Sequence, residues 1–482
     1  MNNDEKKLEW EKVRSTFQTV WGYKDFRPPQ GEIVESLISQ KDALIIMPTG
    51  GGKSICFQLP ALLKNGLTIV ISPLVALMEN QVQELQERRI NAALLHSQLA
   101  PYQRRKILFA LEEQKLRLLY LSPETLLSPP VWERLSKPHL KINALILDEA
   151  HCLVQWGDTF RPAYRRLGAV RQALLKSKPE GTIISVAAFT ATADPLGQKT
   201  IQEVLKLQQP KIFKQNPYRQ NLCPTLCIAW TPQGRRKKLL RFIEKRASQA
   251  GLVYVRTRRD AEEIALWLGS QGYNAPAYHA GLSAQERRSI ETDWLNFKMP
   301  FVVCTNAFGM GINHSSVRWI VHFHPPHLLS EYVQEIGRAG RDGKPAEALT
   351  LISEPTGFLD DGDKQRRRFF SDGVQKQQLE ARQILQKLPR EGNVDAVGRQ
   401  FKNGAIALSL LHSMGQLEWI DPFNYIIKEG GGSHEVSQAH AAKQMQQYLH
   451  TKQCRWQFLL KAFGFDREAL NWRCGHCDNC RH

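Results

Sequence analysis

Long apolar runs are absent from this 482-residue sequence. No stretch reaches the roughly eighteen apolar residues that a membrane-spanning helix needs. The first residues, MNNDEKKLEWEKVRSTF, are charged and contain no apolar core of the signal-peptide type. No internal repeat of fixed period occurs, and the 32 glycines and 25 prolines are near average usage, which excludes collagen-like and low-complexity classes. We therefore expect no membrane partner and a cytoplasmic protein, associated with the nucleoid if the source is a prokaryote.

Acidic residues are the minority among the charged ones. The chain has 65 Lys and Arg against 47 Asp and Glu, which gives a net charge of +18. A field of this sign favours a polyanionic partner, with nucleic acid as the first choice and an anionic membrane surface as the second. A soluble basic protein without such a partner is equally compatible with the charge alone. The length and the apolar fraction of 42% predict a folded chain of about two to four domains.

Cysteine is sparse, with nine residues, and the missing export signal favours reduced thiols and metal binding over disulfides. Zinc takes four thiolate or imidazole ligands, and two-residue gaps let a turn aim successive sulfurs inward. Four cysteines near the end of the chain have gaps of 19, 2 and 2 residues: Cys454, Cys474, Cys477 and Cys480. We predict a structural zinc site there, with His476 and His482 as nearby substitute ligands. Cys223 and Cys227 are expected to be packing residues.

A glycine-rich loop, MPTGGGKS, lies between a predicted strand at 43–47 and the helical stretch SICFQLPALL. This order is the context of a phosphate-binding loop, in which glycines let backbone N–H groups close on phosphate oxygens. We expect Lys53 to reach the outer phosphates and Ser54 to bind Mg²⁺. The strict pattern has glycine where Met47 stands, so a simple tight turn is the alternative. The predicted nucleotide-contacting residues are Thr49, Gly50, Gly51, Gly52, Lys53 and Ser54.

Two adjacent carboxylates, Asp148 and Glu149, follow a second apolar run at 144–147. If this run is a parallel strand, they lie in the crevice where α/β sheets bind ligands. One carboxylate can then hold Mg²⁺ through water, and the other can polarise the attacking water. A lone acidic pair is usually a solvated turn. Together with the Gly-Lys-Ser loop, the pair predicts hydrolysis of a nucleoside triphosphate.

The motifs around these two sites occur in a fixed order. They are WGYKDFRPPQ, ISPLVALMENQV, LLYLSPETL, AHCLVQWGDTFRPAY, FTATAD, AYHAGLSAQER, VVCTNAFGMGIN and YVQEIGRAGRDGKPAEAL. In that order and with DEAH at 148–151, the sequence resembles the superfamily 2 helicase core and, more narrowly, the RecQ-type DNA helicases. The likeness covers about residues 21–352 and returns at the cysteines. It implies a 3′-to-5′ DNA helicase driven by ATP and Mg²⁺, acting in repair or recombination.

The resemblance assigns roles to further residues. Tyr23, Arg27 and Gln30 would bind the adenine, since a side-chain amide can pair with it while ring and guanidinium planes stack on it. From the second half, Gln334, Arg338 and Arg341 would act on the γ-phosphate, at spacings that share one face if the segment is helical. Among these, Arg341 is our choice for the arginine that stabilises charge in the transition state.

An aromatic loop directly after the carboxylates should couple DNA binding to ATP hydrolysis. It contains Trp156, Phe160 and Arg161, whose planar groups can stack on bases of any sequence. The alternative is that these rings fill a core. The family pattern has histidine where Asp158 stands, and an aspartate cannot change its charge near neutral pH as histidine does. We therefore expect coupling through Trp156 and Arg161 that is weaker than in the family.

The expected fold class is α/β, with two tandem RecA-like parallel-sheet domains, a winged-helix-like insert and a small helical zinc-binding module. The winged helix is predicted from helix, turn, helix, strand, turn and strand along 393–431. The family commonly continues into a further winged helix and a helical DNA-binding domain, so we expect a short form in which the insert substitutes for the duplex-splitting hairpin. The expected domains are helicase domain 1 (1–210), helicase domain 2 (211–353), a helical connector (354–385), the insert (386–432) and the zinc module (433–482).

The expected partners are single-stranded DNA and tailed or forked duplexes. Single-strand-binding and repair proteins are candidate protein partners, and a monomer is favoured. A DNA-stimulated translocase or an RNA helicase with weak unwinding is the alternative enzyme. The remaining alternative is a scaffold with a dead nucleotide site, which the presence of Lys53, Asp148, Glu149, Arg338 and Arg341 disfavours.

Overall fold

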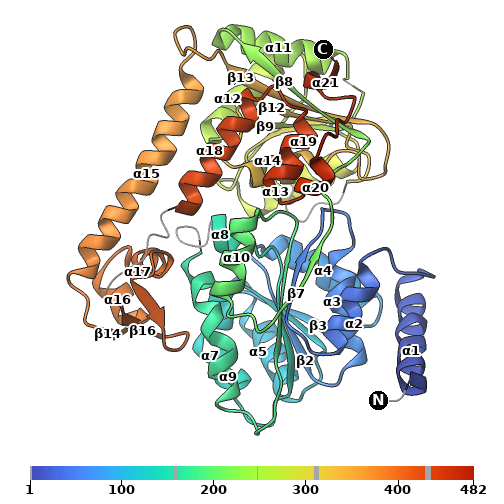
Figure 1. Ribbon diagram of the computed structural model, residues 1–482, viewed down its shortest axis with the longest axis vertical. Coiled ribbons are helices and arrows are strands. Elements are labelled where there is room, and N and C mark those ends of the chain that lie inside the picture. The colour runs from blue at the N-terminus through green and yellow to red at the C-terminus, as the bar shows by residue number, and fades with distance from the viewer. Residues whose placement is uncertain (1–2, 156–160, 247, 309–313, 429–435, 482) are drawn as a thin grey trace. The chain divides into compact units, whose positions relative to one another are not determined.

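The computed structural model describes residues 3–155, 161–246, 248–308, 314–428 and 436–481 (Figure 1). The chain divides into two compact units, and each unit is built from two segments of the sequence. The first unit comprises Met1–Gln215 and Gln377–Ser437, and the second comprises Asn216–Lys376 and Gln438–His482. Within the described ranges, no helix is both long enough and apolar enough to cross a membrane.

A seven-stranded parallel sheet forms the core of the first unit, in the order β3-β4-β2-β5-β6-β1-β7. Its inner strands are short apolar runs that are almost completely buried, as expected for a parallel sheet with helices on both faces. The strands are β1 (Ala43–Ile46), β2 (Leu67–Ile71), β3 (Ala92–Leu95), β4 (Leu118–Leu121), β5 (Ile142–Leu147), β6 (Ser185–Thr190) and β7 (Lys211–Lys214).

Helices connect these strands. They are α1 (Asn3–Trp21), α2 (Gln30–Ile38), α3 (Lys53–Leu63), α4 (Val75–Glu87), α5 (Pro101–Glu112), α6 (Pro123–Leu126), α7 (Pro129–Leu135), α8 (Cys152–Gln155), the 3₁₀ helix η1 (Pro162–Ala169), α9 (Val170–Leu175) and α10 (Pro195–Val204).

The first domain was expected to end at residue 210, but the structure adds one more strand, β7, to its sheet. Strand β7 pairs with β1 in parallel register, with Ala43 opposite Lys211 and Ile46 opposite Lys214. Three of its four residues are exposed, and only Phe213 is buried. The sequence pattern therefore lacks the apolar run of an inner strand, because β7 lies at the edge of the sheet.

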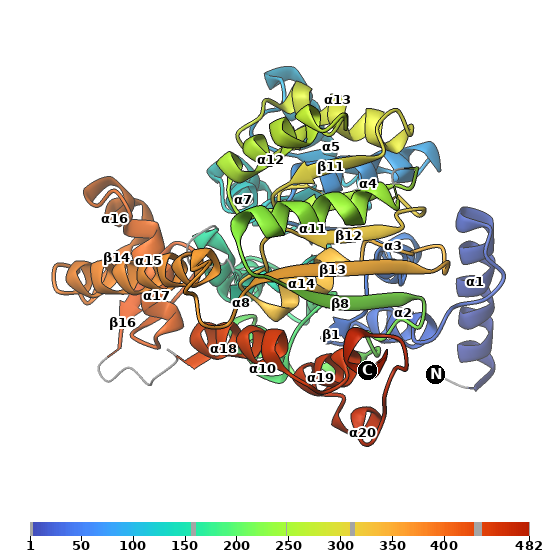
Figure 2. The same cartoon turned by 90° about the horizontal axis from the view of Figure 1, so that it is seen from above.

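A six-stranded parallel sheet forms the core of the second unit, in the order β10-β11-β9-β12-β13-β8. Figure 2 shows β12, β13 and β8 side by side. With the first sheet, it gives the two RecA-like domains that the sequence predicts. The strands are β8 (Leu222–Ala229), β9 (Gly251–Tyr254), β10 (Ala277–Tyr278), β11 (Phe301–Cys304), β12 (Trp319–His322) and β13 (Ala346–Ser353).

The helices of this unit include those that follow its strands and those of the zinc module. They are α11 (Pro232–Glu244), α12 (Arg258–Ser270), α13 (Ala284–Leu295), α14 (Leu329–Ile336), α18 (Val436–His450), α19 (Arg455–Ala462), α20 (Asp466–Ala469) and α21 (Asp478–Arg481). A long helix, α15 (Gly362–Leu385), carries the chain from the second unit to the first. Its start is fixed by the buried Arg235, which donates to Asp360 and Asp363.

The insert has the predicted winged-helix order and one further strand. It contains β14 (Glu391–Asn393), α16 (Val394–Gln400), α17 (Gly404–Ser413), β15 (Leu417–Trp419) and β16 (Asn424–Ile427), with the antiparallel sheet in the order β14-β16-β15. The insert belongs to the first unit, where α17 packs against η1. The hairpin tip is also attached: the rings of Trp132 and Phe423 meet edge to face at 5.1 Å, and Arg166 donates to the carbonyl of Pro422.

The zinc module packs on the edge strand β8 and on α14 of the second unit. The indole N–H of Trp456 donates to the carbonyl of Leu222 (3.0 Å), and the hydroxyl of Tyr448 donates to that of Tyr332 (2.9 Å). Both hydrogen bonds are buried, and leaving their donors and acceptors unpaired would cost folding free energy. The module is thus part of the core of this unit.

Candidate active site and metal centre

The glycine-rich loop joins the end of β1 to the start of α3. Gly50 and Gly52 have positive φ angles of 83° and 77°, a region that residues with a side chain rarely adopt. At Gly52 a Cβ atom would also lie 2.4 Å from the Nε2 atom of Gln30. Because α3 begins at Lys53, its unpaired backbone N–H groups lie at the loop. This is the local structure that an anion-binding helix N-terminus requires.

Gln30 connects the expected adenine-binding segment to this loop. Its Oε1 atom accepts from the backbone N–H of Arg27 (3.0 Å), and its Nε2 atom donates to the carbonyl of Gly51 (3.0 Å). Gln30 is buried, whereas the side chains of Arg27 and Tyr23 are exposed. The structure therefore brings the Gln30 amide against the phosphate loop and leaves two planar side chains at the surface nearby.

Asp148 lies directly after β5, as predicted, and is buried. Burial raises the pKa of Asp148 to about 6, with a further increase from Glu149, while the nearby Lys53 ammonium opposes the increase. The backbone N–H of Glu149 donates to Oδ1 of Asp148 (3.1 Å), and the Lys53 Nζ atom lies 3.4 Å from the carbonyl of Met47. A cation bound at this carboxylate would offset the cost of burying its charge.

Gln81 is a site residue that the sequence reasoning missed. It lies on the buried face of α4, and its Nε2 atom donates to Oδ2 of Asp148 at 3.3 Å. Both side chains are buried. The available signal was a glutamine among apolar residues on the inner face of a predicted helix, in the motif MENQV. A buried amide needs a partner, so its position indicates a polar group across the packing interface.

The rest of the DEAH motif connects to the FTATAD motif. The Nδ1 atom of His151 lies 3.2 Å from Oε2 of Glu149 and 3.5 Å from the Oγ1 atom of Thr190 at the end of β6. His151 and Thr190 are both buried. Thus His151 connects Glu149, the carboxylate that we expect to polarise water, with the FTATAD motif at the end of β6.

In the second unit, Gln334, Arg338 and Arg341 do not share one helix face, because the helix does not extend through all three residues. Helix α14 ends at Ile336, so Gln334 is helical, while both arginines lie in the following turns. Gly340, between the arginines, has a positive φ of 62°, which a continuing helix does not permit. The spacing of four and three residues is therefore not a helical one here.

A buried ion cluster lies beside this turn. Glu335 accepts from Arg256 at 3.0 Å, and its other neighbour is the Nε2 atom of His322 at 2.9 Å. Burial alone would raise the pKa of Glu335, but the Arg256 guanidinium and His322 together lower it to about 2. The cluster joins α14 to the ends of β9 and β12, and so fixes the segment that leads to the two arginines.

The expected coupling loop is only partly described. Trp156, Asp158 and Phe160 lie outside the described residues. Arg161 is described, and its guanidinium pairs with Glu124 at 2.8 Å. The neighbouring Tyr164 is completely buried in the core of the first unit.

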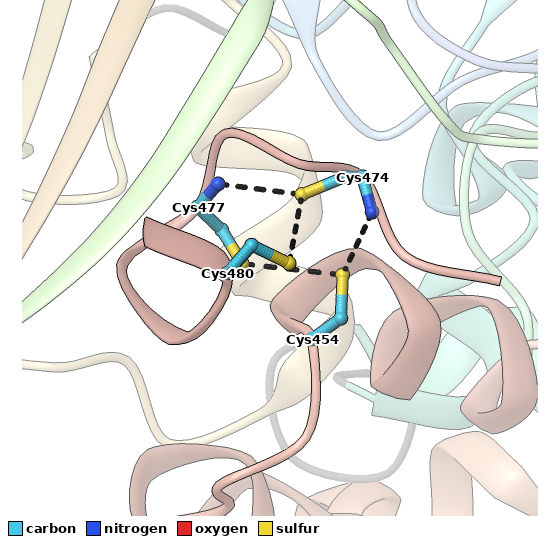
Figure 3. Close-up of side chains that lie close together, drawn as sticks. All are labelled: Cys454, Cys474, Cys477 and Cys480. Atoms are coloured by element: carbon cyan, nitrogen blue, oxygen red, sulfur yellow. Dashed lines mark hydrogen bonds between the residues drawn. The ribbon is translucent and has the colours of Figure 1, made fainter. Parts of the chain in front are cut away.

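The four cysteines predicted to bind zinc come together in the second unit. Their sulfur atoms all lie within 4.8 Å of one another and point toward a common centre (Figure 3). Tetrahedral zinc with Zn–S bonds of about 2.3 Å requires sulfurs about 3.8 Å apart. The pairs Cys474–Cys480 and Cys454–Cys477 are 3.8 and 3.9 Å apart. The group therefore fits a four-thiolate zinc site.

Neighbouring polar groups support this cluster. Backbone N–H groups of Cys474 and Arg455 donate to sulfurs of Cys454 (3.3 Å) and Cys477 (3.4 Å). Both ring nitrogens of His476 face backbone carbonyl oxygens, which does not suit the alternative role of a ligand. The thiol of Cys223 donates to the carbonyl of His476 at 2.8 Å, so this cysteine packs against the module, as predicted.

Comparison with solved structures places the fold among helicases. The Mycobacterium smegmatis helicase Lhr bound to ssDNA and AMP-PNP matches with a TM-score of 0.57 and 19% identity, over 90% of this chain and 61% of that chain. At this identity the likeness shows the fold alone.

Comparison with known families and proteins covers most of the chain. Three family models match: the DEAD/DEAH box helicase (27–200), the helicase conserved C-terminal domain (234–343) and RecQ zinc-binding (420–481). The ATP-dependent DNA helicase RecQ of a Synechocystis strain is 49% identical over 97% of this chain and 98% of its own length. The protein of the same name in Pasteurella multocida is 40% identical over 70% of this chain and 52% of its own length. The chain belongs to the RecQ family of ATP-dependent DNA helicases.

Proposed function

We propose that this helicase translocates 3′ to 5′ on single-stranded DNA and unwinds duplexes in repair or recombination. The observation that carries the proposal is that the phosphate loop, which leads into Lys53, and the buried Asp148 follow β1 and β5 of one parallel sheet. Closure and reopening of two RecA-like domains around ATP would move the enzyme along the strand.

The first domain would supply half of the catalytic groups. Thr49, the three glycines and Ser54 would surround the phosphates, and Lys53 would neutralise the outer ones. With Mg²⁺ bound, Asp148 would hold its water shell, and the ion would neutralise charge on the phosphate oxygens. Glu149 would orient and polarise the attacking water, held in place by His151.

The second domain and the adenine segment would complete the site. Gln334, Arg338 and Arg341 would contact the γ-phosphate, with Arg341 as the charge-stabilising arginine. Tyr23 and Arg27 would pack on the adenine, and Gln30 would read its edge. The bond from Gln30 to the Gly51 carbonyl supports this role, because adenine binding would then act directly on the phosphate loop.

Trp156, Phe160 and Arg161 would stack on single-stranded DNA and signal its presence to Glu149. The measurement is ATP turnover with and without oligonucleotide. We expect Trp156→Ala to lose most of the DNA stimulation and to keep the basal rate. If the stimulation survives, another element senses DNA. With Asp158 in place of histidine, we expect weaker coupling than in the family.

The remaining assignments follow from the same model. The zinc would be structural, since four protein ligands leave no open position. We propose the domain division expected from the sequence, except that the first boundary moves past β7. We also propose a cytoplasmic location. The substrates would be tailed or forked duplexes.

The test is ATP-driven unwinding of DNA with a 3′ tail, a 5′ tail or an RNA strand, at stated salt because backbone affinity depends steeply on it. We expect unwinding of the 3′-tailed DNA only, and none by Lys53→Ala. Unwinding of the 5′-tailed DNA would reverse the polarity. Preference for the RNA duplex, or ATP turnover without strand separation, would favour the alternative enzyme.

A further inference from the structure

A cavity opens at the edge of the first sheet opposite the nucleotide site. Its volume is about 420 Å³, and it lies where β2, β4 and β5 begin, whereas the phosphate loop and Asp148 follow the other ends of the strands. Three cations line it: Lys115, Arg117 and Lys141. The remaining described lining residues are amide, glycine and leucine residues, and no carboxylate is among them.

One of these cations is held in place by hydrogen bonds, and another lies near a further lysine. Arg117 donates to the carbonyl of Lys64 (3.2 Å) and to Oδ1 of Asn65 (3.3 Å), which orients its guanidinium at the cavity. Burial lowers the pKa of Lys64, Glu9 opposes this, and Lys141 lowers it further. Lys115 has Glu113 at 3.9 Å, a distant pairing of two exposed side chains. A concentration of positive charge of this kind favours phosphate groups.

An aromatic stripe on α5 leads to the cavity. Tyr102 and Phe109 are seven residues apart, so they lie on one helix face, and they are 70% and 59% exposed. Lys106 lies between them on this face, and the Lys115 ammonium is 5.8 Å from the centre of the Phe109 ring. Exposed aromatic rings beside a positively charged groove are the usual features of surfaces that bind single-stranded nucleic acid.

We propose that Tyr102, Lys106, Phe109, Lys115, Arg117 and Lys141, together the α5 surface, form an additional binding site for single-stranded DNA. A base stacks on Phe109, and backbone phosphates contact the cations of the cavity. This site is separate from the aromatic loop after the DEAH motif. The strand would therefore be held at a second place on the first domain, whichever polarity the motor has.

Binding of fluorescent oligo-dT by the full chain, measured over a range of salt, tests the site. We expect Phe109→Ala to weaken binding about fivefold or more, the effect of losing one stacked base. Lys115→Ala with Lys141→Ala should reduce the slope of log affinity against log salt by about 1.4, or about 0.7 for each lost phosphate contact. Matched controls are Phe358→Ala, which removes an 89% exposed ring elsewhere, and Lys364→Ala with Lys376→Ala.

A second measurement does not depend on affinity changes. Oligo-dT should protect Lys115 and Lys141 from acetylation, read by mass spectrometry, while Lys364 stays reactive. The proposal requires both results. It is overturned if the α5 variants match their controls, if the two lysines react equally with and without DNA, or if inorganic pyrophosphate protects them and oligo-dT does not.

Discussion

At the scale of single residues, burial disfavours the ionised form of Asp148, and the neighbouring groups determine how much of the carboxylate is available to bind a cation. Lys53 and the amide of Gln81 favour its charged form, while burial and Glu149 disfavour it. Gln81 contacts one carboxylate oxygen from α4, a helix to which the sequence analysis assigned no site residue. It is therefore a positioning residue, which acts through Asp148.

Removing the Gln81 amide tests this role. We expect Gln81→Ala to lower ATP turnover or Mg²⁺ affinity by about 10- to 100-fold, the usual effect of losing a group that orients a metal ligand. The measurement is ATPase activity as a function of Mg²⁺ concentration. Gln83→Ala is the control, because Gln83 is on the same helix but bonds Glu87 at the surface. An unchanged Mg²⁺ requirement in Gln81→Ala would contradict the role.

Glu335 gives a second prediction at this scale. Glu335→Ala leaves Arg256 buried without its carboxylate, so the second unit should lose about 3–5 kcal/mol of unfolding free energy. Denaturant unfolding, followed for both units, measures the loss. The control is Glu347→Ala, which breaks the ion pair of a half-exposed carboxylate with Arg246 and should cost under about 1 kcal/mol.

The pH dependence of the Glu335 cluster follows from the lowered pKa. Because the folded pKa is about 2 and the ordinary value is 4.5, the carboxylate contributes stability above about pH 4.5 and loses it as the pH falls toward 2. The stability difference between the wild type and Glu335→Ala should therefore shrink between pH 5 and about pH 3. A constant difference would mean that the charge of Glu335 is not what stabilises the unit.

At the scale of elements, the insert differs from a free winged helix. Its second helix, α17, is the one that enters the DNA groove in helix-turn-helix proteins. Here α17 packs against η1, and Leu408 and Leu411 are completely buried. The hairpin tip is attached to Arg166 and Trp132 as well. A DNA role for the insert would therefore have to use its remaining surface.

Loosening the hairpin tip tests how firmly the insert is attached. Phe423→Ala removes a ring that contacts Trp132 and Arg166, and it should reduce the stability of the first unit by about 1–3 kcal/mol. Ile420→Ala, at an exposed position of the same hairpin, should change stability by no more than about 0.5 kcal/mol. Denaturant unfolding and the rate of proteolysis within 377–437 measure the effect. Equal stability of the two variants would show that the tip is not anchored.

At the scale of the whole molecule, the last segment of the chain completes the second unit. The zinc module returns to β8 and α14 after the insert has joined the first unit. Tyr332, which bonds the module, is on the same short helix as Gln334. Loss of the metal should therefore affect the segment of Gln334, Arg338 and Arg341, the residues that we propose contact the γ-phosphate.

We expect one zinc per chain, and none after Cys454→Ala. The variant should melt several degrees lower and lose ATP turnover, because the Tyr448–Tyr332 bond and the packing around Trp456 depend on the module. Elemental analysis, thermal unfolding and ATPase assays measure these effects. Cys227→Ala is the control, since this cysteine is outside the cluster. A Cys454→Ala protein with full zinc content would exclude the four-cysteine site.

The sequence alone determined the features whose chemistry is local. The glycines before Lys53, the acidic pair after an apolar run and the spacing of the last three cysteines each predict a short local structure and a role for it. Two parallel sheets followed from the alternation of apolar strands and helices. Each of these depends on residues close together in the chain, so the pattern is visible without the fold.

Only the tertiary structure decided the contacts between distant segments. Gln81 and Asp148 are 67 positions apart in the sequence, and only the fold brings them into contact. Strand β7 has no apolar run, because it lies at the edge of the sheet, so the sequence pattern did not predict it. The turn at Gly340 ends the helix that the spacing of the arginines suggested, and packing on η1 buries α17. Such features depend on which surfaces pack together. A sequence pattern predicts which residues form an apolar or polar surface, but it does not predict which other surface packs against it.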